Sequence, residues 1–226
     1  MIGSALADLA ALADPVNAAK AAAYHKTQRR YLGIAVPQLE SLVAKWRAEA
    51  SVADRISLAA ALWDSDIHDA RVAAAKLLTQ ARLRPSDQAA WDLICQWVPG
   101  FDAWAIADHA CIAAQKRITA DPSRLDEVER WTQSENMWTR RAALVATLPF
   151  AKLNHPKPHE IQARSRILDW AAIYTLDHDW FIQKALAWWL RDLSKHDPAL
   201  TKAFLAEHGH LMKSFARKEA AKYLVT

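Results

Sequence analysis

Three tryptophans lie three or four residues from a charged residue, a spacing that places both side chains on one face of a helix. The pairs are Trp104 with Asp108, Trp138 with Arg141, and Trp188 with Lys184. Basic side chains attract phosphates, and indole rings stack on bases or attract cations. This combination favours a nucleic acid over a peptide as the partner of these residues.

Asp108 is the acidic member of these pairs. Phosphate repels a carboxylate, so an acid on a surface that faces nucleic acid lowers affinity unless it has another task. One such task is to stabilise a cation that develops during a reaction. The alternative is structural, in which Asp108 forms an intramolecular ion pair with Arg141 or Lys184.

The composition predicts that helices position these residues. The chain of 226 residues contains 4 glycines but 47 alanines, and alanine is the strongest helix former. No segment shows the alternation of a half-buried strand, and no glycine-rich phosphate-binding motif is present. We therefore expect an all-α fold of about ten to twelve amphipathic helices.

Prolines mark the expected helix starts. Three aspartate–proline pairs show the pattern of an N-cap followed by a proline in the first turn. These pairs are Asp14-Pro15, Asp121-Pro122 and Asp197-Pro198. Pro37 and Pro85 are also expected to begin helices, and residues 154–159 form the longest predicted loop.

A recurring pattern organises the chain: a charged residue, then small residues, then an apolar end. The charged positions are Arg71, Asp108, Arg141, Lys184 and Lys218, spaced 37, 33, 43 and 34 residues apart. Such periods are typical of helix-pair repeats of the HEAT or TPR kind, which stack into a curved solenoid. We expect one HEAT-like solenoid domain over residues 1–226, clearest from about 55 to 225, with these positions on a concave basic face. Alternatively, they are only the solvated edge of each helix.

Composition excludes several classes of protein. With 52% hydrophobic and 24% charged residues and a net charge of +4, the chain is globular rather than disordered. No apolar run is long enough to cross a membrane, and the N-terminus lacks the pattern of a signal peptide. The two cysteines, Cys95 and Cys111, indicate a reducing, cytoplasmic location, and both are expected on buried helix faces. The 9 histidines are scattered, so we expect no metal site.

Core packing is the expected role of several other tryptophans among the 11 of the chain. These residues are Trp46, Trp63, Trp91, Trp170 and Trp189.

Several segments resemble the DNA alkylation repair family of AlkD type. The most specific is the Phe-Ile-Gln-Lys-Ala…Trp…Leu-Arg element at residues 181–191. The others are residues 31–37, which resemble the family's N-terminal Leu-Gly-Ile-x-x-Pro signature, and residues 104–108, 138–143 and 217–220. Together they extend over roughly residues 20–225, nearly the whole chain.

The resemblance implies a HEAT-like solenoid that wraps duplex DNA in a basic concave groove. It implies a monofunctional DNA glycosylase, without a cofactor, that releases N3- and N7-alkylated purines from double-stranded DNA without inserting the base into a pocket. Asp108 would be the catalytic carboxylate, and Trp104 and Trp188 would contact the backbone and sugar of the lesion nucleotide. The residues that would bind DNA phosphates are Arg141, Arg140, Lys184, Arg191, Arg71 and Lys218. We expect such a protein to act as a monomer.

One segment departs from the family pattern. Family members often have Trp-Asp-x-x-Asp, whereas residues 104–108 lack the inner aspartate. A rival alignment at residues 91–95 keeps the inner aspartate but places Cys95 at the catalytic position. Asp108 fits better, because its steps of 37 and 33 residues to the neighbouring repeats are balanced, whereas Cys95 would need steps of 24 and 46. Two other functions stay open: a DNA-binding paralogue without catalysis, and a HEAT-like scaffold for protein interactions.

Overall fold

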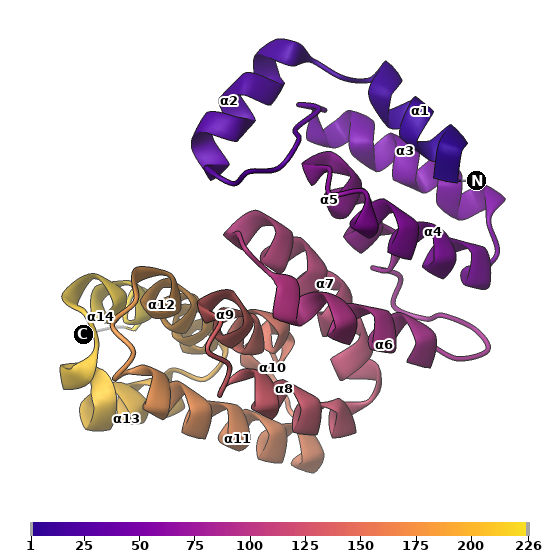
Figure 1. Ribbon diagram of the computed structural model, residues 1–226. Coiled ribbons are helices and arrows are strands. Elements are labelled where there is room, and N and C mark those ends of the chain that lie inside the picture. Colours follow the sequence, from indigo (N-terminus) through magenta and orange to yellow (C-terminus); the bar gives the residue numbers. More distant parts are fainter. Residues whose placement is uncertain (1, 225–226) are drawn as a thin grey trace. The chain divides into compact units, whose positions relative to one another are not determined.

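The structure, a computed structural model, describes residues 2–224, and these residues form helices joined by loops (Figure 1). Within them the only strand-like pairing is an isolated bridge between Arg30 and Ile67. The expected all-α class is therefore confirmed. The described residues form 14 α-helices, more than the ten to twelve expected, because several are short. The chain packs as two compact units, Met1–Ala120 and Asp121–Thr226. The expected single domain stays a prediction.

Unit 1 is built around one central helix, α5, against which α3, α4 and α7 pack. The elements of the unit are α1 (Ile2–Ala11), α2 (Pro15–His25), α3 (Val36–Glu49), α4 (Val52–Asp64), α5 (His68–Leu77), α6 (Gln88–Trp97), the 3₁₀-helix η1 (Val98–Gly100) and α7 (Trp104–Ala120). Small side chains make the close approach of α5 possible, since Ala73, Ala74 and Ala75 are fully buried on it.

Unit 2 is built around α12 in the same way, with α9, α10, α11, α13 and α14 packed against it. The elements of this unit are η2 (Pro122–Arg124), α8 (Leu125–Trp131), α9 (Met137–Ala146), α10 (Leu148–Ala151), α11 (Pro158–Tyr174), α12 (Trp180–His196), α13 (Pro198–His208), η3 (Gly209–Leu211) and α14 (Ser214–Ala220). Trp189 on α12 is its largest fully buried side chain.

Most of the predicted helix starts are confirmed. The carboxylate of Asp14 accepts hydrogen bonds from the amides of Val16 and Asn17 at the start of α2, at 2.9 and 3.1 Å. Asp197 accepts one from the Leu200 amide at the start of α13, at 3.0 Å. Asp121 likewise caps η2, and Pro37 is the second residue of α3.

Two details of the predicted helix starts were wrong. Pro85 begins no helix, because Ser86 and Asp87 come between it and α6, and the Ser86 hydroxyl accepts a hydrogen bond from the Gln88 amide at 3.1 Å. The predicted loop at residues 154–159 ends earlier than expected, since α11 already starts at Pro158, a position that a proline without an N–H tolerates well.

The Leu-Gly-Ile segment before α3 owes its sequence to a close packing contact. Gly33 has a positive φ of 74°, and a β-carbon there would lie 2.2 Å from the Ala18 amide nitrogen of α2. The amides on either side of it, those of Leu32 and Ile34, both donate hydrogen bonds to the buried Asp69 carboxylate, at 2.8 and 2.9 Å. Glycine is needed here because other residues rarely adopt this backbone conformation.

The recurring sequence pattern corresponds to a recurring position in the helices. Asp108, Arg141, Lys184 and Lys218 are each the fifth residue of a helix, namely α7, α9, α12 and α14. Arg71 is the fourth residue of α5, within the one-residue uncertainty of a helix boundary. The HEAT-like repeat fold expected from the spacing is thus confirmed, whereas the concave basic face stays a prediction.

The tryptophans predicted for the core are buried, each with at most 6% of its surface exposed; they are Trp46, Trp63, Trp91, Trp170 and Trp189. Cys111 is buried as expected, but Cys95 is only half-buried. The reason is its position on α6, whose buried stripe consists of Ala90, Trp91, Ile94 and Trp97 and leaves Cys95 at its edge. In the described part of the chain, no helix has both the length and the apolar character needed to cross a membrane.

Candidate nucleic-acid interface

Trp104 and Asp108 lie one turn apart at the start of α7, and both side chains are half-buried. They therefore share a helix face, as their spacing predicted. The indole of Trp104 contacts two rings from the end of α2: that of His25, with centroids 5.5 Å apart, and that of Tyr24, at 6.1 Å. Sequence reasoning missed these contacts, because no spacing links α2 to α7.

His25 belongs to a group of stacked rings that packs against Trp104. Its imidazole stacks on that of His68 with centroids 4.7 Å apart, and His68 stacks on Tyr31 at 4.8 Å. Burial lowers the pKa of His68 to about 4, with a further contribution from neighbouring His25, whose own pKa is also lowered by burial. Both imidazoles are consequently neutral near pH 7, and neutral rings can stack without charge repulsion.

Unit 2 contains a pocket of about 210 Å³ that unites four of the predicted site residues. It is lined by Arg141, Lys184, Trp188, Arg191 and Glu219. Three cations and one carboxylate leave the pocket a formal charge of +2, and the indole of Trp188 provides an apolar wall. In protein–nucleic acid complexes generally, basic side chains contact phosphates and aromatic rings pack on sugars and bases.

The two arginines of this pocket are held in place by neighbouring groups. Arg141 is only 5% exposed, and its Nη1 donates a hydrogen bond to the Phe181 carbonyl at 2.9 Å. Arg191 forms an ion pair and hydrogen bond with Glu219, which holds the pKa of that carboxyl below its usual value. Glu219 was missed by the sequence analysis, although it directly follows the repeat position Lys218.

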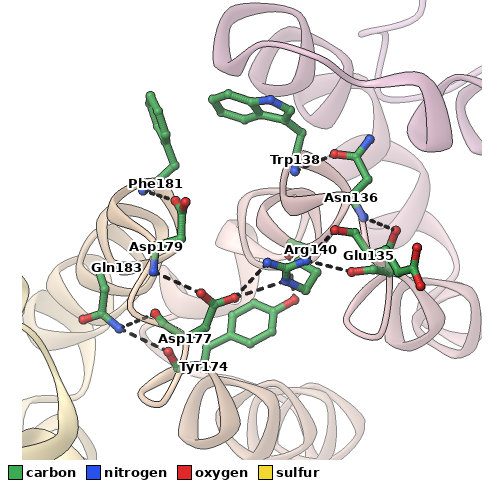
Figure 2. A network of polar contacts seen from close by, with 10 residues as sticks. Glu135, Asn136, Trp138, Arg140, Tyr174, Asp177, Asp179, Phe181 and Gln183 are labelled. Carbon is green, nitrogen blue, oxygen red and sulfur yellow. Dashed lines mark hydrogen bonds and ion pairs between the residues drawn. The ribbon is translucent and has the colours of Figure 1, made fainter.

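Arg140 has a structural position rather than one at the pocket. Its guanidinium forms an ion pair with Asp177 at 3.1 Å and donates to the carbonyl oxygens of Ser134 and Glu135 at 2.8 and 2.9 Å (Figure 2). Its own carbonyl accepts a hydrogen bond from the Tyr174 hydroxyl at 2.7 Å. This network fixes the loop before α12, the helix that carries three residues of the pocket.

Arg71, expected to bind phosphate, is likewise engaged within unit 1. Its Nη2 lies 3.1 Å from the Asp66 carboxylate, and its Nε donates to the Trp63 carbonyl at 3.0 Å. The guanidinium also covers the ring of Trp63, 5.1 Å from its centroid. Only 15% of the Arg71 side chain is exposed, whereas Lys218 on α14 belongs to the exposed residues.

Trp138 begins a row of aromatic rings at the N-terminal ends of α9, α12 and α14. Its ring contacts Phe181 with centroids 4.6 Å apart, Phe181 contacts Trp180 at 4.9 Å, and Trp180 contacts Phe215 at 6.2 Å. Lys184 lies over the face of Trp180, 5.3 Å from its centroid. The row therefore packs the helix ends together and connects to the pocket through Lys184.

The described residues contain no group of three or more histidine, cysteine, aspartate or glutamate side chains placed to share a metal ion.

Fold and side chains together define an all-α protein of paired-helix repeats with a basic, tryptophan-lined pocket. The chain belongs to the DNA alkylation repair enzyme family, whose model matches residues 5–224. No functionally curated protein matches its sequence.

Solved structures share the fold at low sequence identity. A predicted DNA alkylation repair enzyme from Enterococcus faecalis superposes with a TM-score of 0.77 at 23% identity, covering 95% of this chain and 97% of that one. Two proteins from Streptococcus mutans, smu.31 and AlkD2, each give a TM-score of 0.62, at 20% and 19% identity. The matches cover 84% and 85% of this chain, and 93% and 91% of theirs.

Proposed function

We propose that this member of the family is a DNA glycosylase that excises N3- and N7-alkylated purines from duplex DNA. The observation that carries the proposal is the Trp104–Asp108 pair on one face of α7. Asp108 occupies the helix position at which the other repeats have an arginine or a lysine. An acid in a series of basic positions is explained if it meets a cation during the reaction.

The chemistry of the substrate requires little from the protein beyond that carboxylate. Alkylation at N3 or N7 makes the purine cationic, so the base leaves as a neutral molecule and needs no strong general acid. Positive charge then develops on the deoxyribose ring, where the Asp108 carboxylate stabilises it and helps position water. The face of Trp104, one turn away on the same helix, adds cation–π attraction of about 0.5–2 kcal/mol. The alkylated base is not drawn into a pocket.

The pocket of unit 2 supports the binding half of the proposal. Arg141 and Arg191 line the pocket with planar guanidinium groups, whose N–H donors suit phosphate oxygens, and Lys184 adds a flexible cation beside them. Lys218 extends this basic surface on α14. We do not assign phosphate to Arg140 or Arg71, because neither lines this pocket and each pairs with an aspartate outside it.

The structure also favours Asp108 over the rival position at Cys95. Asp108 lies on α7, a helix that packs against α5 as the other repeat helices pack against one another. Cys95 lies on α6, and the preceding tryptophan of that alignment, Trp91, is buried with 5% exposure. Trp91 belongs to the buried apolar stripe of α6, whereas Trp104 is half-buried at the start of α7.

Replacement of Asp108 by asparagine tests the proposal. The wild-type protein should release 3-methyladenine and 7-methylguanine from methylated duplex DNA, and Asp108→Asn should bind the same DNA but lose most of this release. Asp92→Asn, which removes the inner aspartate of the rival alignment, and Cys95→Ser are matched controls that should excise normally. Undiminished excision by Asp108→Asn would refute the assignment, and binding without excision by the wild type would identify a non-catalytic paralogue.

A further inference from the structure

A second basic pocket lies entirely within unit 1, between α3, α5 and α7, and has a volume of about 530 Å³. It is lined by Glu40, Ala44, Arg47, Lys76, Thr79, His109, Ile112 and Lys116. It starts beside the proposed catalytic residue, since His109 follows Asp108 in the chain and Ile112 lies one helical turn beyond it. None of its cations occupies a position of the recurring pattern.

The charges of this pocket match those of the pocket in unit 2. Arg47, Lys76 and Lys116 oppose one carboxylate, Glu40, which again gives a formal charge of +2. In the described part of the chain, Arg47 and Lys116 form no ion pair, whereas Lys76 and Glu40 are paired at 2.7 Å. The unit 2 pocket has the same arrangement, with Arg191 paired to Glu219.

The Lys76–Glu40 pair is one that an incoming anion can replace. The Lys76 side chain is fixed in the pocket wall with 17% of its surface exposed, whereas that of Glu40 is 56% exposed. Exposed ion pairs contribute little to stability, so separating this one costs little. A phosphate that displaced Glu40 would contact Lys76 and approach Arg47 and Lys116 from the same side.

The other lining groups suit a phosphodiester better than a fully charged small ion. Ile112, 42% exposed, and Ala44 offer apolar surface for a sugar. His109 is half-buried, and burial together with the charge of Lys76 lowers its pKa to about 4, so it is neutral at pH 7. A neutral imidazole presents both a donor and an acceptor, which fits a hydroxyl or phosphate ester edge.

We infer that this pocket is a second DNA-binding site, in which Lys76, Arg47 and Lys116 hold backbone phosphates of the duplex beside Asp108. The inference rests on the proposed function, and it gives unit 1 the phosphate contacts that the sequence pattern had assigned to Arg71. The Glu40 carboxylate then limits affinity in the free protein, because it competes with phosphate for Lys76.

Two opposite substitutions test this inference on the full chain. Lys76→Gln should weaken binding to undamaged duplex DNA about tenfold at low salt, and should reduce the slope of log affinity against log salt by about 0.9. Glu40→Gln releases Lys76 and should tighten binding several-fold, a gain that misfolding cannot produce. Arg47→Gln and Lys116→Gln should each act like Lys76→Gln. Lys45→Gln, an exposed lysine of α3 outside this pocket, is the matched control and should change the slope less.

The outcomes separate this inference from the proposed glycosylase. If the wild type excises methylated purines but Lys76→Gln and Glu40→Gln both keep wild-type DNA affinity and salt slope, only the pocket assignment is overturned. If the wild type binds DNA without excising bases and the variants shift binding as expected, the pocket stands and the glycosylase fails. A titration with inorganic phosphate distinguishes a site for small anions. Phosphate binding that Lys76→Gln abolishes, with DNA binding unaffected, would overturn the DNA assignment.

Discussion

Trp188 and Trp189 are consecutive in α12 but face opposite environments. Trp189 is completely buried, and its Nε1 donates to the Thr147 carbonyl at 3.4 Å. Trp188 is half-buried and lines the basic pocket of unit 2. The 100° rotation between neighbouring helical residues thus gives one indole to the core and the other to the proposed DNA strand.

Alanine at each of these two positions should separate stability from binding. Trp189→Ala should lower the free energy of unfolding by about 3–5 kcal/mol, because it opens a large cavity in the core. Trp188→Ala should change stability far less but weaken binding of duplex DNA, which loses an indole contact worth about 1–3 kcal/mol. Urea denaturation and a DNA titration of both variants provide the comparison. Equal destabilisation by the two substitutions would show that Trp188 also belongs to the core.

Substitution of Gly33 should disrupt the junction between α2 and α3. Gly33→Ala should cost roughly 3 kcal/mol or more, because the added carbon would meet the Ala18 amide at 2.2 Å and the backbone has a positive φ. Gly100→Ala is the control, since a β-carbon there has no neighbour within 4 Å, and it should stay within about 0.5 kcal/mol of wild type. Thermal or urea denaturation measures both. A stable Gly33→Ala protein would contradict the packing argument.

Arg140 should prove to stabilise the loop before α12 rather than to bind DNA. Arg140→Gln removes the cation that pairs with Asp177 and the donor to two carbonyl oxygens, so the free energy of unfolding should fall by about 2–3 kcal/mol. The exposed pair of Arg130 with Glu127 is the control, and Arg130→Gln should cost at most about 0.5 kcal/mol. For variants that remain folded, DNA affinity should stay near that of wild type. A reduced salt slope for Arg140→Gln, with stability intact, would instead indicate a direct phosphate contact.

The histidines of unit 1 should make its stability sensitive to acid. The pKa values of His68 and His109 are lowered to about 4, so between pH 6.5 and pH 4 the unfolded chain binds protons that the folded chain does not. The free energy of unfolding should therefore fall as the pH decreases through this window, by roughly 1–3 kcal/mol for each histidine.

Urea denaturation at pH 7, 5.5 and 4 measures this effect. Carboxylates titrate in the same range, so wild type must be compared with His68→Gln and His109→Gln at each pH. Each variant should lose part of the pH dependence, and the double variant should lose more. A double variant with the full wild-type dependence would show that carboxylates alone cause the acid sensitivity.

The amino-acid sequence alone determined the fold class, the repeat and the family. The scarcity of glycine and abundance of alanine specify helices, aspartate–proline pairs cap them, and the charged residues recur at the fifth position of α7, α9, α12 and α14. These are local properties, which depend on backbone conformation and on spacing along one helix. For the same reason, the sharing of one helix face by Trp104 and Asp108 followed from their four-residue separation.

Only the tertiary structure decided which charged side chains are occupied by internal partners. Arg140 and Arg141 are adjacent in sequence, yet one joins an internal network with Asp177 and the other lines the pocket of unit 2. The cations of the unit 1 pocket come from three helices that no sequence period aligns. An arginine's partner depends on which loops and helix ends meet around it, and those contacts form between residues far apart in the chain.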